Sequence, residues 1–317
     1  MNELYLTARN PMVEPHLHAW GWEIPVYLFL GGWVAGILVL CGWALFKGRR
    51  YSAGSASFAL ASSGLFVLGL ATLSAGMLAL FLDLEHKTHV WRLYATFQPW
   101  SPMSWGAWIL VLVYPVLVAG VLLEPPAALL AHVPALGAVT RRLNGDTRRR
   151  RAIGVVSMVA GVALGVYTGI LLSALGARPL WSSALLGPLF LVSGLSAAAA
   201  FAHMVSPDRE ERETLARFDN LFLMLELAVI VLFLIGLANA TAVHAQAAAL
   251  LLGGPMTAVF WVGVVGLGIV LPLVIQSLAV THRIAHTPVA PLLVLAGGLA
   301  LRFVIVAAGQ LSHWPRL

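Results

Sequence analysis

Long apolar segments recur along the whole chain and limit what it can fold into. Stretches of about 20 residues with few charged side chains are the pattern of transmembrane helices. A hydropathy window of about 19 residues places them near 24–46, 58–82, 104–130, 152–174, 182–204, 218–238, 256–279 and 290–311. Only 10% of the residues are charged, against about 25% in soluble domains. The sequence therefore predicts an all-α integral membrane protein with eight transmembrane helices.

Lysine and arginine are concentrated in alternate loops, which predicts the orientation of the helices. Most of the 19 lysines and arginines lie in loops 46–57, 131–151, 205–217 and 280–289, and loops rich in these residues stay in the cytoplasm. The start of the chain lacks the basic segment and apolar core of a signal peptide. We therefore expect a multi-pass protein of the bacterial cytoplasmic (inner) membrane with both termini extracytoplasmic. The net charge of +6 follows from this bias and indicates anionic lipid, not nucleic acid, as the partner of the basic loops.

A tyrosine and a threonine interrupt the fourth apolar segment. Tyr167 and Thr168 lie in "GVYTGILLSALGARPLW", residues 165–181, roughly 10 Å below the outer surface at about 1.5 Å per residue. A tyrosine of the aromatic belt is the ordinary alternative. A phenol at this depth can also donate a hydrogen bond without carrying a charge, which an apolar environment tolerates better than an ion. Tyr167 is therefore a candidate for binding a polar ligand group within the membrane.

Two charged residues fall well inside predicted spans, Glu226 in the sixth and Arg302 near the middle of the eighth. A lone charge at the bilayer centre costs about 2.5–3.5 kcal/mol on insertion scales, so such residues pair or line a polar path. One interpretation is an ion pair that braces the two helices. The other is a proton path from the cytoplasm, with Glu124 and Asp219 at its entrance.

The chain offers few ligands for a resident redox centre. Its single cysteine, Cys41, cannot form a cysteine-based cluster, so any iron–sulfur chemistry must belong to another subunit. A transmembrane haem needs two histidines that face each other at matching depth, whereas the ten histidines lie in loops or at predicted helix ends. We therefore expect no haem or iron–sulfur cluster in this chain.

Four segments resemble the successive signatures of one membrane-protein family. They are "GWEIPVYLFLGGWVAG" (21–36), "VYTGILLSALGARPLW" (166–181), "FWVGVVGLGIVLPLVI" (260–275) and "LRFVIVAAGQ" (301–310). The family is NrfD/PsrC, the quinone-reactive membrane subunits of polysulfide, nitrite, tetrathionate and related respiratory reductases. Because the segments follow in order, the resemblance covers nearly the whole chain.

The resemblance implies an architecture and partners. The eight helices would form two four-helix bundles, with a quinone or quinol (menaquinone or ubiquinone) bound near the outer face. An extracytoplasmic iron–sulfur subunit of the four-cluster type would dock there and link this chain to a terminal catalytic subunit. The expected organisation is a tail at 1–23, spans 1–3 within 24–140, a basic cytoplasmic loop at 141–151, span 4 at 152–174 and the second bundle at 175–317.

The resemblance also assigns site residues. The tyrosine of the family's fourth-helix motif falls on Tyr167, and the polar position at the start of its first helix falls on Tyr27. His18 or Glu23 could replace Tyr27 as the second carbonyl partner, and the acidic residue at the outer end of the second helix falls on Asp83. The predicted quinone contacts and proton carriers are Tyr167, Thr168, Tyr27, Trp22, Glu23, His18 and Asp83.

Two other functions remain open at this point. A secondary transporter is one, since Pro115, Pro188 and Pro272 lie inside spans and broken helices are typical of transporter sites, although kinks are also common in other membrane helices. A purely structural anchor for an external enzyme is the other. A transporter would be active alone, whereas electron transfer requires a partner subunit.

Overall fold

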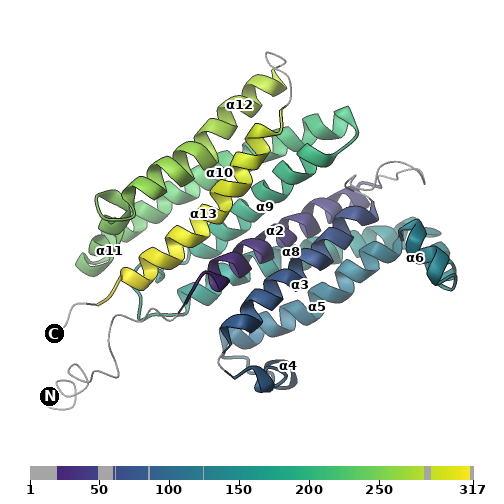
Figure 1. Ribbon diagram of the computed structural model, residues 1–317, viewed down its shortest axis with the longest axis horizontal. Helices are drawn as coiled ribbons and strands as arrows, with labels where there is room; N and C mark the ends of the chain where they lie inside the picture. The colour runs from purple at the N-terminus through teal and green to yellow at the C-terminus, as the bar shows by residue number, and fades with distance from the viewer. Residues whose placement is uncertain are drawn as a thin grey trace.

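The computed structural model describes residues 20–48, 60, 62–84, 86–123, 125–281 and 287–314 (Figure 1). Within this part of the chain, 8 helices are long and apolar enough to cross a membrane. They are α2 (Glu23–Phe46), α3 (Ser63–Asp83), α5 (Pro102–Leu123), α8 (Thr147–Ser173), α9 (Leu186–Val205), α10 (Arg209–Ala240), the π-helical segment η3 (Val259–Val270) continued by α12 (Leu271–Val280), and α13 (Val289–Leu311). The predicted all-α membrane fold is confirmed.

Five shorter helical segments lie outside the spans in the part of the chain that the structure describes. They are η2 (Lys87–His89), α4 (Arg92–Ala95), α6 (Ala127–His132), α7 (Leu136–Asn144) and α11 (Ala242–Leu252). Figure 1 shows α4 and α6 at opposite ends of the α3–α5 pair. Helix α11, which lies between the sixth and seventh spans, was not predicted from the sequence.

The predicted third span, 104–130, is too long at its C-terminal end. Helix α5 ends at Leu123, and a new helix, α6, begins at Ala127 after Pro125 and Pro126. Proline has no backbone N–H and disfavours helical geometry at the preceding residue, so two prolines stop the helix although the apolar pattern continues.

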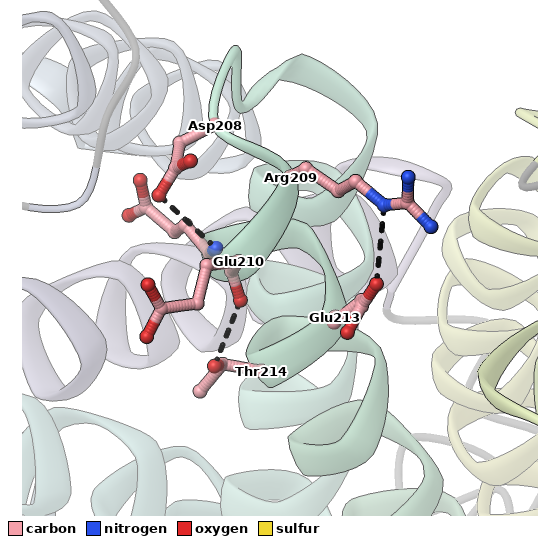
Figure 2. Close-up of polar contacts among 6 residues, drawn as sticks. Asp208, Arg209, Glu210, Glu213 and Thr214 are labelled. Carbon is pink, nitrogen blue, oxygen red and sulfur yellow. Dashed lines mark hydrogen bonds and ion pairs between the residues drawn. The ribbon is translucent and has the colours of Figure 1, made fainter.

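Helix α10 is the longest, with 32 residues, and it begins outside the apolar segment. The Asp208 carboxylate accepts the backbone N–H of Glu211 at 3.3 Å, which satisfies one of the free donors at the helix start. Arg209 and Glu213 form an ion pair at 3.3 Å along the first turn, and the Thr214 hydroxyl donates to the Glu210 carbonyl at 2.9 Å. Figure 2 shows these contacts on the polar first turns of α10, which lead into its apolar part.

The spans pack as two groups of four (Figure 1). Helices α2, α3, α5 and α8 form the first group, and α9, α10, η3–α12 and α13 form the second. Helix α2 joins the groups, since it also contacts α9 and α13. A Cβ added to Gly36 would lie 2.3 Å from the Gly194 carbonyl oxygen, and one added to Gly194 would lie 2.3 Å from that of Gly32. Small residues thus let the α2 and α9 backbones touch, as is typical of membrane helices.

The two ends of the described chain meet at one end of the helices. The backbone N–H of Trp20 donates to Gln310 Oε1 at 3.3 Å, and Gln310 Nε2 donates to the Trp20 carbonyl at 3.2 Å. The indole rings of Trp20 and Trp181 stack with centroids 5.1 Å apart. The segment before α2, the α8–α9 connection and the end of α13 therefore share this end of the molecule.

Candidate functional site

A cavity of about 280 Å³ opens in the first helix group, at the end where Trp20 meets Gln310. Helices α2, α3, α4, α5 and α8 wall it. Its surface is mostly apolar, with a few polar groups. The lining residues are Trp20, Ile24, Tyr27, Leu28, Met77, Leu80, Asp83, Leu84, Leu93, Tyr94, Met103, Gly106, Ala107, Leu110, Tyr167, Leu171, Leu172 and Leu175. An apolar pocket with a few convergent polar groups is the usual form of a small-molecule site.

Three tyrosines from three different helices reach the cavity. Tyr27 of α2 and Tyr167 of α8 are 3% and 5% exposed, and Tyr94 of α4 is half-buried. The three phenols lie close enough to interact electrostatically. Burial, with a smaller contribution from Tyr114, raises the pKa of Tyr94 above its usual value, so this hydroxyl stays a neutral donor at physiological pH. The cavity therefore holds several uncharged hydrogen-bond donors.

A carboxylate marks the mouth of the cavity. Asp83 is the last residue of α3 and lines the cavity. Glu23 is the first residue of α2 and interacts electrostatically with Asp83. Glu23 does not line the cavity but lies beside Asp83, which does. Together they offer proton acceptors between the phenols and water.

Trp20 closes one side of the cavity and is held from two directions. Gln310 fixes its backbone, and the ring of Trp181 stacks on its indole. Trp181 is itself held, because its Nε1 donates to the Ile305 carbonyl at 2.9 Å. Arg178 Nη1 donates to the carbonyl oxygens of Gln310 and Ser312 at 2.8 and 2.9 Å. The second helix group thus fixes a wall of a cavity that lies in the first.

Other predicted site residues lie elsewhere. The Thr168 side chain is fully buried, and its hydroxyl donates to the Gly165 carbonyl at 2.8 Å within the same helix. Trp22 is 56% exposed and does not line the cavity. His18 and Glu124 lie outside the described residues. Of the predicted quinone contacts and proton carriers, the structure brings Tyr27, Tyr167 and Asp83 together.

A second polar group lies within the second helix group. The Arg302 side chain is 1% exposed and donates to the Ser193 hydroxyl and to the carbonyl oxygens of Phe190 (2.9 Å) and Gly298 (3.1 Å). Its guanidinium also lies over the Phe190 ring, 4.8 Å from the centroid. Glu226 hydrogen-bonds with Ser193 and interacts electrostatically with Arg302. Arg302 and Glu226 therefore lie together, linked by Ser193.

Asp219 extends this polar group along α10. Its carboxylate is fully buried and accepts from the Ser196 hydroxyl and from Gln276 Nε2, both at 2.6 Å. It also interacts electrostatically with Glu226. The sequence indicated Asp219 but not its partners Ser196 and Gln276, because a single polar residue in an apolar helix does not reveal which helix it faces.

No metal centre is found among the described residues, where no three His, Cys, Asp or Glu side chains come together. Cys41 is buried in α2. The phenols and the carboxylate that line the described cavity can hydrogen-bond to a bound molecule and exchange protons with it.

These features define a class of protein first. It is an integral membrane protein whose described residues form eight helical spans, and one group of these helices encloses an apolar cavity lined by phenols and one carboxylate.

Sequence comparisons then give the family. The family described as "Polysulphide reductase, NrfD" matches residues 11–313. The C chain of polysulfide reductase from Wolinella succinogenes is 32% identical over 305 residues, which cover 92% of this chain and 94% of the relative. Protein NrfD of Escherichia coli is 33% identical over 309 residues, covering 92% and 95%. The C subunit of tetrathionate reductase from Salmonella typhimurium is 26% identical over 207 residues, covering 65% and 54%. This chain belongs to the NrfD family, as the sequence resemblance predicted.

Proposed function

We propose that this chain is the quinone-binding membrane subunit of a respiratory oxidoreductase complex. It exchanges electrons between the quinone pool and an extracytoplasmic iron–sulfur subunit, most simply by oxidising quinol for a terminal reductase. Relatives that are named as single subunits of polysulfide and tetrathionate reductases support a membrane role within a multi-subunit complex. The single observation that carries the quinone assignment is the convergence of Tyr27, Tyr94 and Tyr167 on one apolar cavity.

The walls of the cavity suit a menaquinone or ubiquinone. Apolar side chains such as Leu28, Met77 and Leu172 can cover the ring and the start of the isoprenoid chain. Each quinone carbonyl needs a hydrogen-bond donor, which Tyr167 and Tyr27 can supply without the charge that a membrane disfavours.

Oxidation of the quinol releases two electrons and two protons, and the residues divide these tasks. The electrons leave to the iron–sulfur partner, because this chain is proposed to hold no cluster or haem of its own. The protons leave the two hydroxyl groups of the quinol by way of the phenols to Asp83 and Glu23, which stand between the cavity and water. In the reverse direction the same groups return the protons.

The proposed setting is the bacterial cytoplasmic membrane with both termini extracytoplasmic. The basic loops supply this orientation through the positive-inside rule. It places the cavity next to the outer surface, where the quinone lies nearest to an iron–sulfur cluster of a docked subunit. Through that subunit the electrons reach a terminal catalytic subunit.

Quinol oxidation by membranes that carry the whole complex tests the proposal, with wild type compared with Tyr167→Phe. The substitution removes one hydroxyl and keeps the ring. The loss of a hydrogen bond worth about 1.5 kcal/mol lowers turnover by about tenfold or more. Thr168→Val is the matched control, because the Thr168 hydroxyl is bonded within its own helix, and we expect it to retain turnover within about twofold of wild type.

Unchanged turnover in an assembled Tyr167→Phe complex would reject the site. Retained quinol oxidation would then favour a purely structural anchor. Solute uptake by proteoliposomes containing this chain alone would favour the secondary transporter.

A further inference from the structure

Gly106 of α5 lies directly beneath the end of the Tyr167 ring. A Cβ added at this position would lie 1.9 Å from Cζ and 1.9 Å from Oη of Tyr167, and 2.3 Å from Cε1. Non-bonded carbon atoms prefer about 3.5–4.0 Å. The phenol therefore packs directly against the main chain of Gly106. Its hydroxyl end occupies the space that a side chain at position 106 would fill.

Helix α5 is fixed close to this contact, which limits how far it can move away. The Ser104 hydroxyl accepts the Gln98 N–H at 2.9 Å and donates to the Thr96 carbonyl at 3.4 Å. The indole of Trp105 donates to the Pro99 carbonyl at 2.7 Å. These bonds tie the start of α5 to the preceding loop in the two residues before Gly106.

The Tyr167 ring, in contrast, has open space on one side. Both Gly106 and Tyr167 line the cavity, so a ring pushed away from α5 moves into it. A methyl group at position 106 would then displace the hydroxyl and reduce the space for a bound molecule. Gly236 of α10 carries no such restriction, because a Cβ added there would meet nothing within 4 Å.

We propose that Gly106 is a positioning residue for the quinone site, because it sets where the Tyr167 hydroxyl lies and how much room a head group has beside it. This inference rests on the proposed function of the cavity. Gly106 supplies no side chain to the reaction and acts through Tyr167.

The experiment uses the whole complex in membranes and compares Gly106→Ala with Gly236→Ala. Binding is measured by fluorescence quenching of the quinol analogue 2-heptyl-4-hydroxyquinoline N-oxide, and quinol oxidation gives kcat and KM. We expect Gly106→Ala to weaken binding of the analogue and to lower kcat/KM, each by about tenfold, as the loss of one hydrogen bond does. Gly236→Ala stays within about twofold of wild type, since it only replaces glycine by a better helix former on an exposed face.

A double-mutant cycle separates positioning from general damage to the fold. When the hydroxyl is already absent, in Tyr167→Phe, the added Gly106→Ala change should lower kcat/KM by no more than about twofold, because coupled residues are non-additive. If the two substitutions lower kcat/KM by factors that multiply in the double variant, the inference is overturned. A Gly106→Ala complex that behaves like Gly236→Ala would overturn it as well. A normal Tyr167→Phe complex would instead reject the proposed site.

A Gly106→Ala complex that does not assemble is also informative. Tyr167→Leu in the same chain removes Cζ and Oη, the atoms that the new methyl group would meet. The complex that carries both Gly106→Ala and Tyr167→Leu should then assemble and recover part of the binding of the analogue. Failure of Tyr167→Leu to restore assembly would show that the added methyl group acts elsewhere.

Discussion

Glu226, Ser193 and Arg302 link three helices of the second group, α10, α9 and α13, to the helix that carries Tyr27. Ser193 accepts from Arg302 and hydrogen-bonds with Glu226. Arg302 also reaches α2, where a Cβ on Gly32 would lie 3.1 Å from its Nη2. Tyr27 is five residues earlier on α2, which corresponds to about 7.5 Å along the helix. This geometry supports both a bracing role for the pair and a proposed proton path from Asp219 through Glu226 toward the cavity.

The Glu226→Gln variant distinguishes these two roles. Glutamine keeps the shape and can still hydrogen-bond to Ser193, but it cannot carry a proton. If Glu226 relays protons across the membrane in addition to the two that quinol oxidation releases, proteoliposomes containing the Glu226→Gln complex should lose most proton uptake from the side of Asp208, while quinol oxidation falls by no more than about threefold. Glu213→Gln changes the same charge near the start of the same helix and serves as the control. Normal uptake together with normal oxidation in Glu226→Gln would end the proton-path hypothesis and leave the bracing role.

The sequence identified part of the cavity at the residue scale. Tyr167 could be selected because a phenol is conspicuous in an apolar span, whereas Asp83 was assigned through the resemblance to the family's motifs. Thr168 follows Tyr167 directly, but successive helical residues point about 100° apart, so its hydroxyl turns to its own helix. Tyr94 lies in a four-residue helix without periodicity, and Gly106 matters only through what it touches. Neither property is visible in a single sequence.

At the scale of elements, the contact between α2 and α9 depends on Gly194. A Cβ there would lie 2.3 Å from the Gly32 carbonyl oxygen, and overpacking of this kind costs about 1–3 kcal/mol. We expect Gly194→Val to separate the two helices, so that the amount of assembled complex recovered in detergent and its temperature of inactivation both fall. Gly236→Val introduces the same side chain on an exposed face and should leave both unchanged. Wild-type recovery and heat resistance of Gly194→Val would show that this close approach does not stabilise the fold.

The positions of the membrane-spanning helices were predictable from the sequence, whereas some helix ends and the shorter helices were not. A span of apolar residues determines that a helix crosses the membrane, because backbone groups have no other partners there. Pro125 and Pro126 end α5 inside an apolar run, so hydropathy alone extended the span to residue 130. Helix α11 has only 11 residues, too few to cross a membrane, and a search for spans does not detect it.

At the scale of the whole molecule, the described structure has two distinct ends. Trp20, Trp181 and Gln310 gather at the end that holds the cavity. The start of α10 lies at the other end, since α9 connects the α8–α9 loop to it. The proposed electron transfer to an extracytoplasmic subunit requires the cavity end to face outward, so the orientation can be tested independently of catalysis.

Cysteine labelling of intact cells gives this test, because the single native cysteine, Cys41, is buried in α2. Ser182 is exposed next to Trp181, and Glu210 is exposed on the first turn of α10 (Figure 2). A membrane-impermeant maleimide added to spheroplasts should label the Ser182→Cys protein at once and the Glu210→Cys protein only after permeabilisation, while wild type stays unlabelled. The positive-inside bias of the loops predicts this pattern. The opposite pattern would place the cavity at the cytoplasmic surface, out of reach of electron exchange with an extracytoplasmic iron–sulfur subunit.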